Sequence, residues 1–207
     1  MAGWTMRRVA LCVMLLFCAT LTGALADSDK QPAQFGDEPW SVSIYTGPFT
    51  TKYFFAVFSS GRIQPTAVGT GIALDRRLFH ITSDFSIMSE AHVVQHYFGH
   101  VSTDLSLGLG FQWNEPFGFP YTSLSGYDGM SYETDPSKTS IGYGGKIYPA
   151  WGPKTLNYMS VEWTAAFTKT SKWDLVFRLF HRSGAFGLVS EGDDGGMTLG
   201  IGVRRRF

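Results

Sequence analysis

The chain has 207 residues and carries 17 basic and 17 acidic side chains, so its formal net charge is zero. Nucleic-acid binding rewards a clustered excess of Lys and Arg, and this balance therefore supplies no electrostatic basis for it. The 24 glycines and 15% aromatic residues favour a sheet protein over a helix bundle, because glycine destabilises helices while aromatic residues fit strands.

The N-terminal residues have the pattern of an export signal. Two arginines at 7–8 precede an apolar run over 9–21, and small residues over 24–26 provide a cleavage site. The apolar run is shorter than the roughly 20 residues that a bilayer-crossing helix needs. We therefore predict that residues 1–26 are a cleaved signal peptide and that residues 27–39 form a short periplasmic lead-in.

Cleavage there changes the chemistry available to the mature chain. Both cysteines, Cys12 and Cys18, lie inside the predicted signal, so disulfides, zinc–thiolate sites and cysteine catalysis are excluded. Arg7 and Arg8 are also lost and no acid is, which leaves 15 basic and 17 acidic residues. The remaining 181 residues, 207 less 26, suit a single domain.

Alternation with a period of two recurs along the rest of the chain. Side chains at i and i+2 on a strand point the same way, and in the clearest case Leu105, Leu107 and Leu109 alternate with Ser106 and Gly108. Eight such strands are predicted, within residues 40–45, 67–74, 79–87, 101–113, 121–133, 159–167, 174–183 and 197–207. The even count predicts an all-β, eight-stranded antiparallel transmembrane β-barrel over residues 40–207.

The two faces of these strands differ in a way that places them in the barrel. One face is large and apolar, and we expect it to face lipid: Leu105, Leu107, Leu109, Val161, Trp163, Leu199 and Ile201. The other is small or polar, with charges expected inside: Asp84, Asp104, Glu162, Arg178, Arg204 and Arg206. A soluble carrier barrel would need the reverse. Side chains just fill an eight-stranded barrel, so we expect a closed lumen that contains a Glu162–Arg178 ion pair.

The predicted connections alternate in length. Short joins are expected at 75–77 and 169–172, and long ones at 46–64, 134–154 and 184–196. Outer-membrane barrels combine short periplasmic turns with longer extracellular loops. We therefore expect the bacterial outer membrane, with both termini of the barrel on the periplasmic side.

The strand over 174–183 carries the chain's candidate chemistry. His181 and Ser183 continue the apolar face of Leu175, Phe177 and Leu179, so they are expected on the lipid-facing wall. A serine needs a neighbouring base to become a nucleophile, and polar groups facing lipid are costly. A hydrolytic pair is one interpretation, and a position at the membrane–water boundary, where such residues cost little, is the other.

The C-terminal 35 or so residues resemble the lipid A 3-O-deacylase family, through His181-Arg182-Ser183, a Gly-rich loop and a short final strand. That family consists of eight-stranded outer-membrane barrels with His-x-Ser on the penultimate strand. The resemblance implies Ser183 as nucleophile, His181 as general base, an acyl ester of lipid A in lipopolysaccharide as substrate, and no metal or cofactor.

The chain departs from the family at the third catalytic group. Aligned from the C-terminus, the family's glutamate falls on Met197, which cannot orient a histidine. Asp194 is the first candidate to replace it, because it lies nearest the start of the last strand, with Asp193 second and Glu191 in the same loop. The rival hypothesis is a non-catalytic barrel of the same descent, with a structural or lipopolysaccharide-binding role.

Two other groups of polar residues are weak candidates for metal sites. His92, His96 and His100 are spaced by four, which would form a metal site on a helix. Their segment is instead expected to be a strand followed by a loop, with the histidines solvated at the strand end. The acids at 128, 133 and 135 lack the ordered ligand spacing of a calcium loop.

Overall fold

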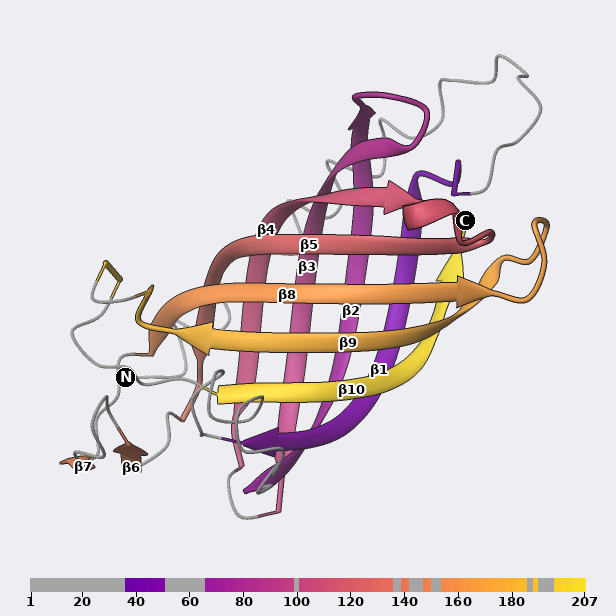
Figure 1. The fold of residues 1–207 in the computed structure, drawn as a ribbon. Coiled ribbons are helices and arrows are strands. Elements are labelled where there is room, and N and C mark those ends of the chain that lie inside the picture. Colours follow the sequence, from indigo (N-terminus) through magenta and orange to yellow (C-terminus); the bar gives the residue numbers. More distant parts are fainter. Residues whose placement is uncertain are drawn as a thin grey trace. The chain divides into compact units, whose positions relative to one another are not determined.

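The fold is a closed barrel of eight antiparallel strands, drawn in Figure 1. The computed structural model describes residues 36–50, 66–98, 101–135, 139–141, 147–149, 154–185, 188–189 and 196–207. The barrel strands are β1 (Trp40–Thr50), β2 (Ala67–His80), β3 (Phe85–Tyr97), β4 (Thr103–Asn114), β5 (Thr122–Glu133), β8 (Thr155–Ala166), β9 (Trp173–Ser183) and β10 (Gly196–Arg206). The predicted fold class is thereby confirmed.

Three short elements of the described chain lie outside the barrel strands. The short strands β6 (Thr139–Ile141) and β7 (Ile147–Pro149) pair with each other in a separate two-stranded sheet. A single 3-10 turn, η2 (Pro116–Gly118), lies between β4 and β5. No helix in the described ranges is long and apolar enough to span a membrane.

The pairing register shows how steeply the strands are inclined. Following paired residues once around the barrel from Trp40 on β1 leads back to β1 at Thr50, ten residues further along. Ten residues at about 3.3 Å each, over eight strands about 4.8 Å apart, tilt the strands by about 40° from the barrel axis. Strands on opposite walls therefore cross steeply, as β1–β4 and β5, β8, β9 and β10 do in Figure 1.

The connections distinguish the two ends of the barrel. We call one the turn end: it holds the connections 81–84, 115–121 and 167–172 and the paired backbones of Trp40 and Phe207. We call the other the loop end: it holds the connections 51–66, 98–102, 134–154 and 184–195. The predicted short join at 169–172 and the predicted long connections at 134–154 and 184–196 are found, but the loop-end connection 98–102 is short, so the predicted alternation holds only in part. The first long connection is shorter than expected, because β1 continues to Thr50.

The predicted boundary between the second and third strands is wrong. Residues 75–77 were expected to form a turn, but they lie within β2, and the turn is at 81–84. Their charges have partners inside the fold. Asp75 accepts a hydrogen bond from Ser41 Oγ at 3.1 Å, and Arg77 donates to the Gly36 carbonyl at 2.5 Å. Asp84 accordingly lies exposed in the turn and not in the lumen.

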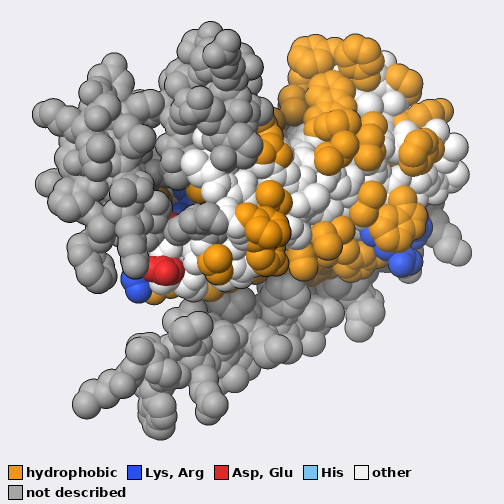
Figure 2. Space-filling model, turned by 90° about the horizontal axis from the view of Figure 1, so that it is seen from below, with side chains coloured by type: hydrophobic (Ala, Val, Ile, Leu, Met, Phe, Trp, Pro, Cys, Tyr) orange, Lys and Arg blue, Asp and Glu red, His pale blue; other side chains and the backbone are white. Residues whose placement is uncertain are grey.

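The outer wall of the barrel is apolar, as the strand parity predicts. Leu107, Leu109 and Ile201 are each more than half exposed, and Val161 is close to half exposed. Asp104, Glu162, Arg178 and Arg204 on the opposite face are buried. Figure 2 shows hydrophobic side chains covering much of the wall, with the visible charged side chains toward its ends. This is the surface that a barrel presents to lipid.

Ion pairs occupy the lumen from its middle to the turn end. Arg178 donates to Glu162 at 2.9 Å and also to Glu90, which confirms the predicted Glu162–Arg178 pair. Arg204 bridges Glu162 at 3.3 Å and Asp174 at 2.8 Å. Each of these buried charges thus faces an opposite charge, which offsets the cost of removing it from water.

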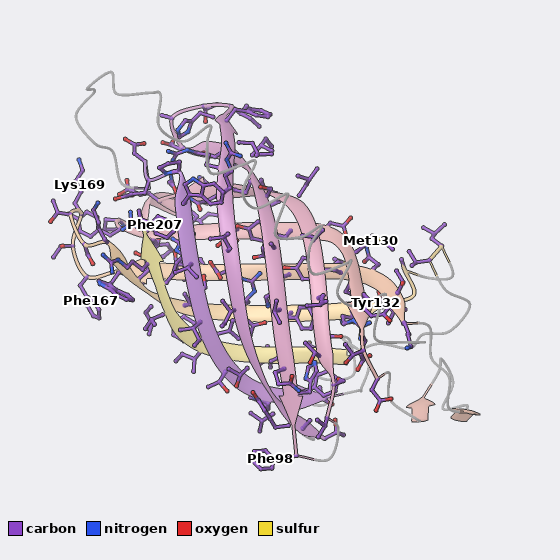
Figure 3. All side chains as sticks on the ribbon, turned by 180° about the vertical axis from the view of Figure 1, so that it is seen from behind. Phe98, Met130, Tyr132, Phe167, Lys169 and Phe207 are labelled. Atoms are coloured by element: carbon purple, nitrogen blue, oxygen red, sulfur yellow. The ribbon has the colours of Figure 1, made fainter. Side chains whose placement is uncertain are left out.

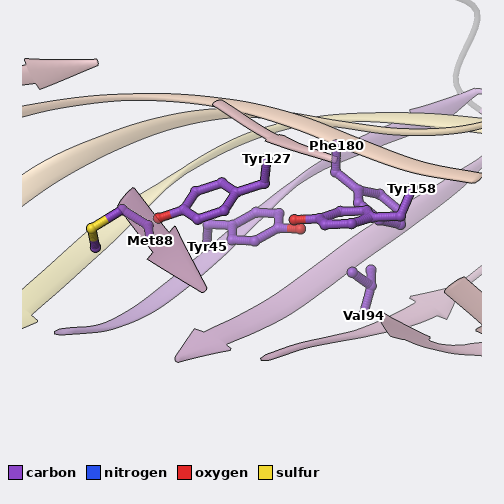
Figure 4. Close-up of a cluster of buried hydrophobic side chains, with 6 residues drawn as sticks. All are labelled: Tyr45, Met88, Val94, Tyr127, Tyr158 and Phe180. Carbon is purple, nitrogen blue, oxygen red and sulfur yellow. The ribbon is translucent and has the colours of Figure 1, made fainter. Parts of the chain in front are cut away.

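Aromatic side chains occupy the remaining lumenal space. The buried cluster in Figure 4 comprises Tyr45, Met88, Val94, Tyr127, Tyr158 and Phe180. Two inward-facing glycines make room for the Tyr45 ring: a Cβ at Gly71 would lie 2.4 Å from it, and a Cβ at Gly200 would lie 2.2 Å from it. The lumen is therefore packed with side chains and holds its tyrosines against bare backbone.

Candidate functional site on the outer wall

The structure places His181 and Ser183 together on the outer face of β9, close to the loop end. Ser183 is the last residue of the strand, and both side chains are half-buried, while their inward neighbours Phe180 and Arg182 are fully buried. Figure 3 shows Met130 and Tyr132 toward this end of the barrel and Phe167 and Phe207 toward the turn end. The predicted pair therefore faces the membrane near the outer end of the barrel wall.

Backbone groups on both sides hold these two side chains. The backbone of Gly196 on β10 hydrogen-bonds to the His181 side chain. The N–H of Ala185 donates to Ser183 Oγ at 3.3 Å. Ala185 has a φ of 50°, a left-handed conformation that is uncommon and costly for a residue with a Cβ. The chain thus turns sharply after β9 and presents an N–H to the serine oxygen.

In the resemblance to the lipid A 3-O-deacylase family, the glutamate position falls on the apolar residue Met197. Met197 on β10 pairs directly with His181, and its side chain is fully buried. Of the acids predicted to replace the glutamate, Asp194, Asp193 and Glu191 all lie outside the described residues. The structure therefore describes His181 and Ser183 but does not test which acid, if any, supports His181.

Two further polar residues lie on the same wall: Asn157, which sequence reasoning did not identify, and Asp128, which it named without placing it on this face. Asn157 on β8 pairs with Ser183 in the register, and its Nδ2 donates to Asp128 Oδ1 at 2.8 Å and to the Gly129 carbonyl at 3.1 Å. Asp128 is exposed on the outer face of β5. The alternation of side chains along the strand could have revealed the position of Asp128, since Asp128 shares a face with Leu124 and Met130.

The histidines upstream are lumenal, and the expectation of solvated strand ends is wrong. His92 contacts the Tyr45 hydroxyl at 2.7 Å, and His96 contacts Asp104 at 2.8 Å, with both rings buried. His100 lies outside the described residues. Within the described part of the chain, no group of three or more His, Cys, Asp or Glu is placed to hold a metal ion.

A second ionic cluster lies beneath the loop end. Arg182 pairs with Asp104 at 3.0 Å and with Glu133 at 2.5 Å. Glu133 is thus lumenal, whereas Asp128 points to the opposite side of β5.

Comparisons with known proteins relate the fold to outer-membrane barrels. No family model matches the sequence, and no curated protein matches it. Among solved structures, the outer membrane enzyme PagL aligns with a TM-score of 0.55 and 13% identity, over 81% of this chain and 99% of that chain. Ail, the attachment invasion locus protein of Yersinia pestis, aligns with a TM-score of 0.39 and 10% identity, over 81% and 97% of the two chains, a score too low to support an argument. The chain is thus similar in fold to PagL, an eight-stranded barrel of the outer-membrane type.

Proposed function

We propose that this protein is an outer-membrane hydrolase that cleaves an acyl ester of lipopolysaccharide, with Ser183 as nucleophile and His181 as general base. The observation that carries the proposal is the place of the pair, on the lipid-facing face of β9 at the loop end. An acyl ester in the outer leaflet lies at that depth and reaches the serine without entering the packed lumen.

The pair supplies the chemistry in two steps. His181 takes the Ser183 proton as Oγ attacks the ester carbonyl, and the alkoxide that leaves takes this proton from the imidazolium. The resulting acyl-serine is hydrolysed by a water that His181 deprotonates, and the proton returns to Ser183 as the fatty acid departs. The Gly196 backbone bond helps to orient the imidazole. In Ser-His-Asp sites a carboxylate both orients the imidazole and stabilises the imidazolium.

A specific observation favours a second candidate, a non-catalytic barrel with a structural or lipopolysaccharide-binding role. The buried Met197 thioether stands beside His181 where the related family has its acid. A thioether cannot stabilise an imidazolium, so activity depends on Gly196, on a residue of the 191–194 loop, or on both.

The test is the acyl pattern of lipid A in cells that express the barrel. Wild type should release one ester-linked acyl chain, visible as a mass loss, while Ser183→Ala and His181→Ala should each abolish it. The double variant should be no worse than either single variant, because residues that act as one unit give nearly the full loss when either is removed. Ser89→Ala, a change on the distant β3, is the matched control and should retain activity.

Substitution in the loop would identify the third group. Asp194→Asn should lower the rate much less than Ser183→Ala if the acid only orients the imidazole from a loop. If cells that express the folded wild-type barrel show an unchanged acyl pattern of lipid A, that result would favour the non-catalytic candidate.

A further inference from the structure

The pair formed by Asp128 and Asn157 is unusual because it faces lipid. Asp128 lies at the middle of β5, where it pairs with Leu109 of β4 on one side and Met159 of β8 on the other. Its carboxylate is thus surrounded by apolar side chains of the outer wall. An ionisable group that faces hydrocarbon is costly and is retained where it has a function.

The hydrogen bonds of this pair leave acceptors facing the membrane. Both protons of the Asn157 amide are used, one on Asp128 Oδ1 and one on the Gly129 carbonyl. A carboxylate only accepts, as does an amide oxygen. Among the residues that the structure describes, none donates to Asp128 Oδ2 or Asn157 Oδ1. The site therefore offers two acceptors that no donor in the described part of the chain satisfies.

The surroundings restrict what that donor is. Ammonium groups and hydrated cations remain at the headgroup level, whereas a hydroxyl on an acyl chain lies within the hydrocarbon. Two exposed methionines line the wall here: Met130 beside Asn157, and Met159 between Asp128 and His181. Unbranched thioether side chains adapt to flexible apolar partners, as an acyl chain requires.

The pair is also continuous with the proposed catalytic residues. Asn157 is directly opposite Ser183, and Asp128 is in the same register row as His181, two strands away. From two strand spacings and two residue rises, the Cα atoms of Asp128 and Ser183 are about 12 Å apart along the wall. A single lipid can cover both.

We propose that Asp128 and Asn157 form a binding site for a hydroxyl group on an acyl chain. The site selects hydroxylated lipids and seats them along β5, β8 and β9 with the ester near Ser183. The hydroxyl donates to Asp128 Oδ2 or Asn157 Oδ1 within the hydrocarbon layer. Its role in presenting an ester rests on the proposed function, whereas the binding itself does not.

Binding is tested in the full barrel with Ser183→Ala, so that no lipid is consumed. The probes are three phosphatidylglycerols: one without a hydroxyl, one with a hydroxyl near the ester, and one with a mid-chain hydroxyl. Native mass spectrometry of barrels given equimolar mixtures measures which lipid is retained. Retention of one hydroxylated probe should exceed that of the plain lipid by about tenfold, the size of one charge-assisted hydrogen bond.

Variants separate a binding role from a structural one. Asp128→Leu and Asn157→Leu should each remove the preference. Asp128→Leu should also unfold at higher denaturant concentration than its parent, because it removes a charge from the lipid-facing wall. The matched control is Thr70→Val, which removes a hydroxyl that contacts Thr46 at 3.1 Å on the outer faces of β1 and β2; the preference should persist there.

Three results would overturn the proposal. Equal retention of all probes would do so, as would an unchanged preference in Asp128→Leu. A loss of dimers on Asp128→Leu, without a change in lipid selection, would assign the pair to a contact between two barrels. Failure of the proposed function is a separate outcome. A wild-type barrel that hydrolyses no ester can still retain the hydroxylated lipid preferentially in this assay.

Discussion

Individual side chains in the lumen show why polar residues are tolerated inside this barrel. Arg178 reaches Glu90, Glu162, the Tyr158 hydroxyl and Ser160 Oγ. Its guanidinium is fully buried, so each of these acceptors replaces water that burial removed. The residue is an electrostatic centre for the middle of the lumen, and its partners depend on it.

Arg178→Met is therefore expected to be strongly destabilising. The substitution keeps most of the packing volume but leaves Glu90 and Glu162 short of a cation, a change that typically costs about 3–5 kcal/mol when one member of a buried pair is removed. Guanidinium unfolding of the barrel in detergent measures the loss. Lys169→Met, in the exposed 167–172 turn, removes the same charge at little cost, and equal losses in the two variants would contradict the lumenal assignment.

Each barrel strand separates the lumen from the lipid, because successive side chains point to opposite faces. On β9 the inward residues Arg178 and Arg182 join ionic clusters, while the outward Phe177 is 48% exposed. His181 and Ser183 extend the outward set up to the loop end. In water, a strand with these two faces would bury its apolar face and expose its arginines. Here the arginines are buried and the apolar face is exposed, which is consistent with a wall covered by lipid.

The depth dependence of this wall is testable on β4. Leu107→Arg places a charge on the outer face near the middle of the strand and should destabilise by about 2–4 kcal/mol. Val101→Arg, at a 67% exposed position before the strand begins at the loop end, should cost about 0–1 kcal/mol, as at the interface. Unfolding in lipid vesicles measures both, and equal costs would place the two positions at one depth.

At the scale of the whole molecule, closure by β1 and β10 leaves the eight-stranded sheet without a free edge. Eight residue pairs join these strands, and the Trp40 and Phe207 backbones pair at the turn end. In hydrocarbon every backbone group needs an internal partner, and a closed barrel meets that need. Arginines lie over tryptophans at the same end, Arg76 over Trp40 and Arg205 over Trp173, as expected of a membrane boundary.

The molecule as a whole should behave as an outer-membrane protein. The mature chain should begin at Asp27, sediment with outer membranes, and migrate differently in gels when it has not been heated, because the closed barrel resists detergent. Mass spectrometry of the intact chain and fractionation measure these properties. Recovery of a soluble periplasmic protein would contradict the assignment.

Parity and composition in the sequence were sufficient for the fold class, the lipid-facing leucines and the Glu162–Arg178 pair. Alternation is a local property, so it can be read wherever one face is uniform. The 75–77 segment was misread because its charges indicate a turn unless their lumenal and interfacial partners are known. Those partners come from Ser41 and Gly36, more than thirty residues away.

The sequence by itself also determined which side chains emerge beside each other on β9, and hence the Ser183 and His181 candidates. Only the tertiary structure brought Asn157 and Asp128 to the same wall, and only it showed that His92 and His96 are lumenal. The physical reason is that contacts across a barrel depend on the stagger between strands. That stagger is the sum of every pairing around the closed sheet, and no single segment encodes it.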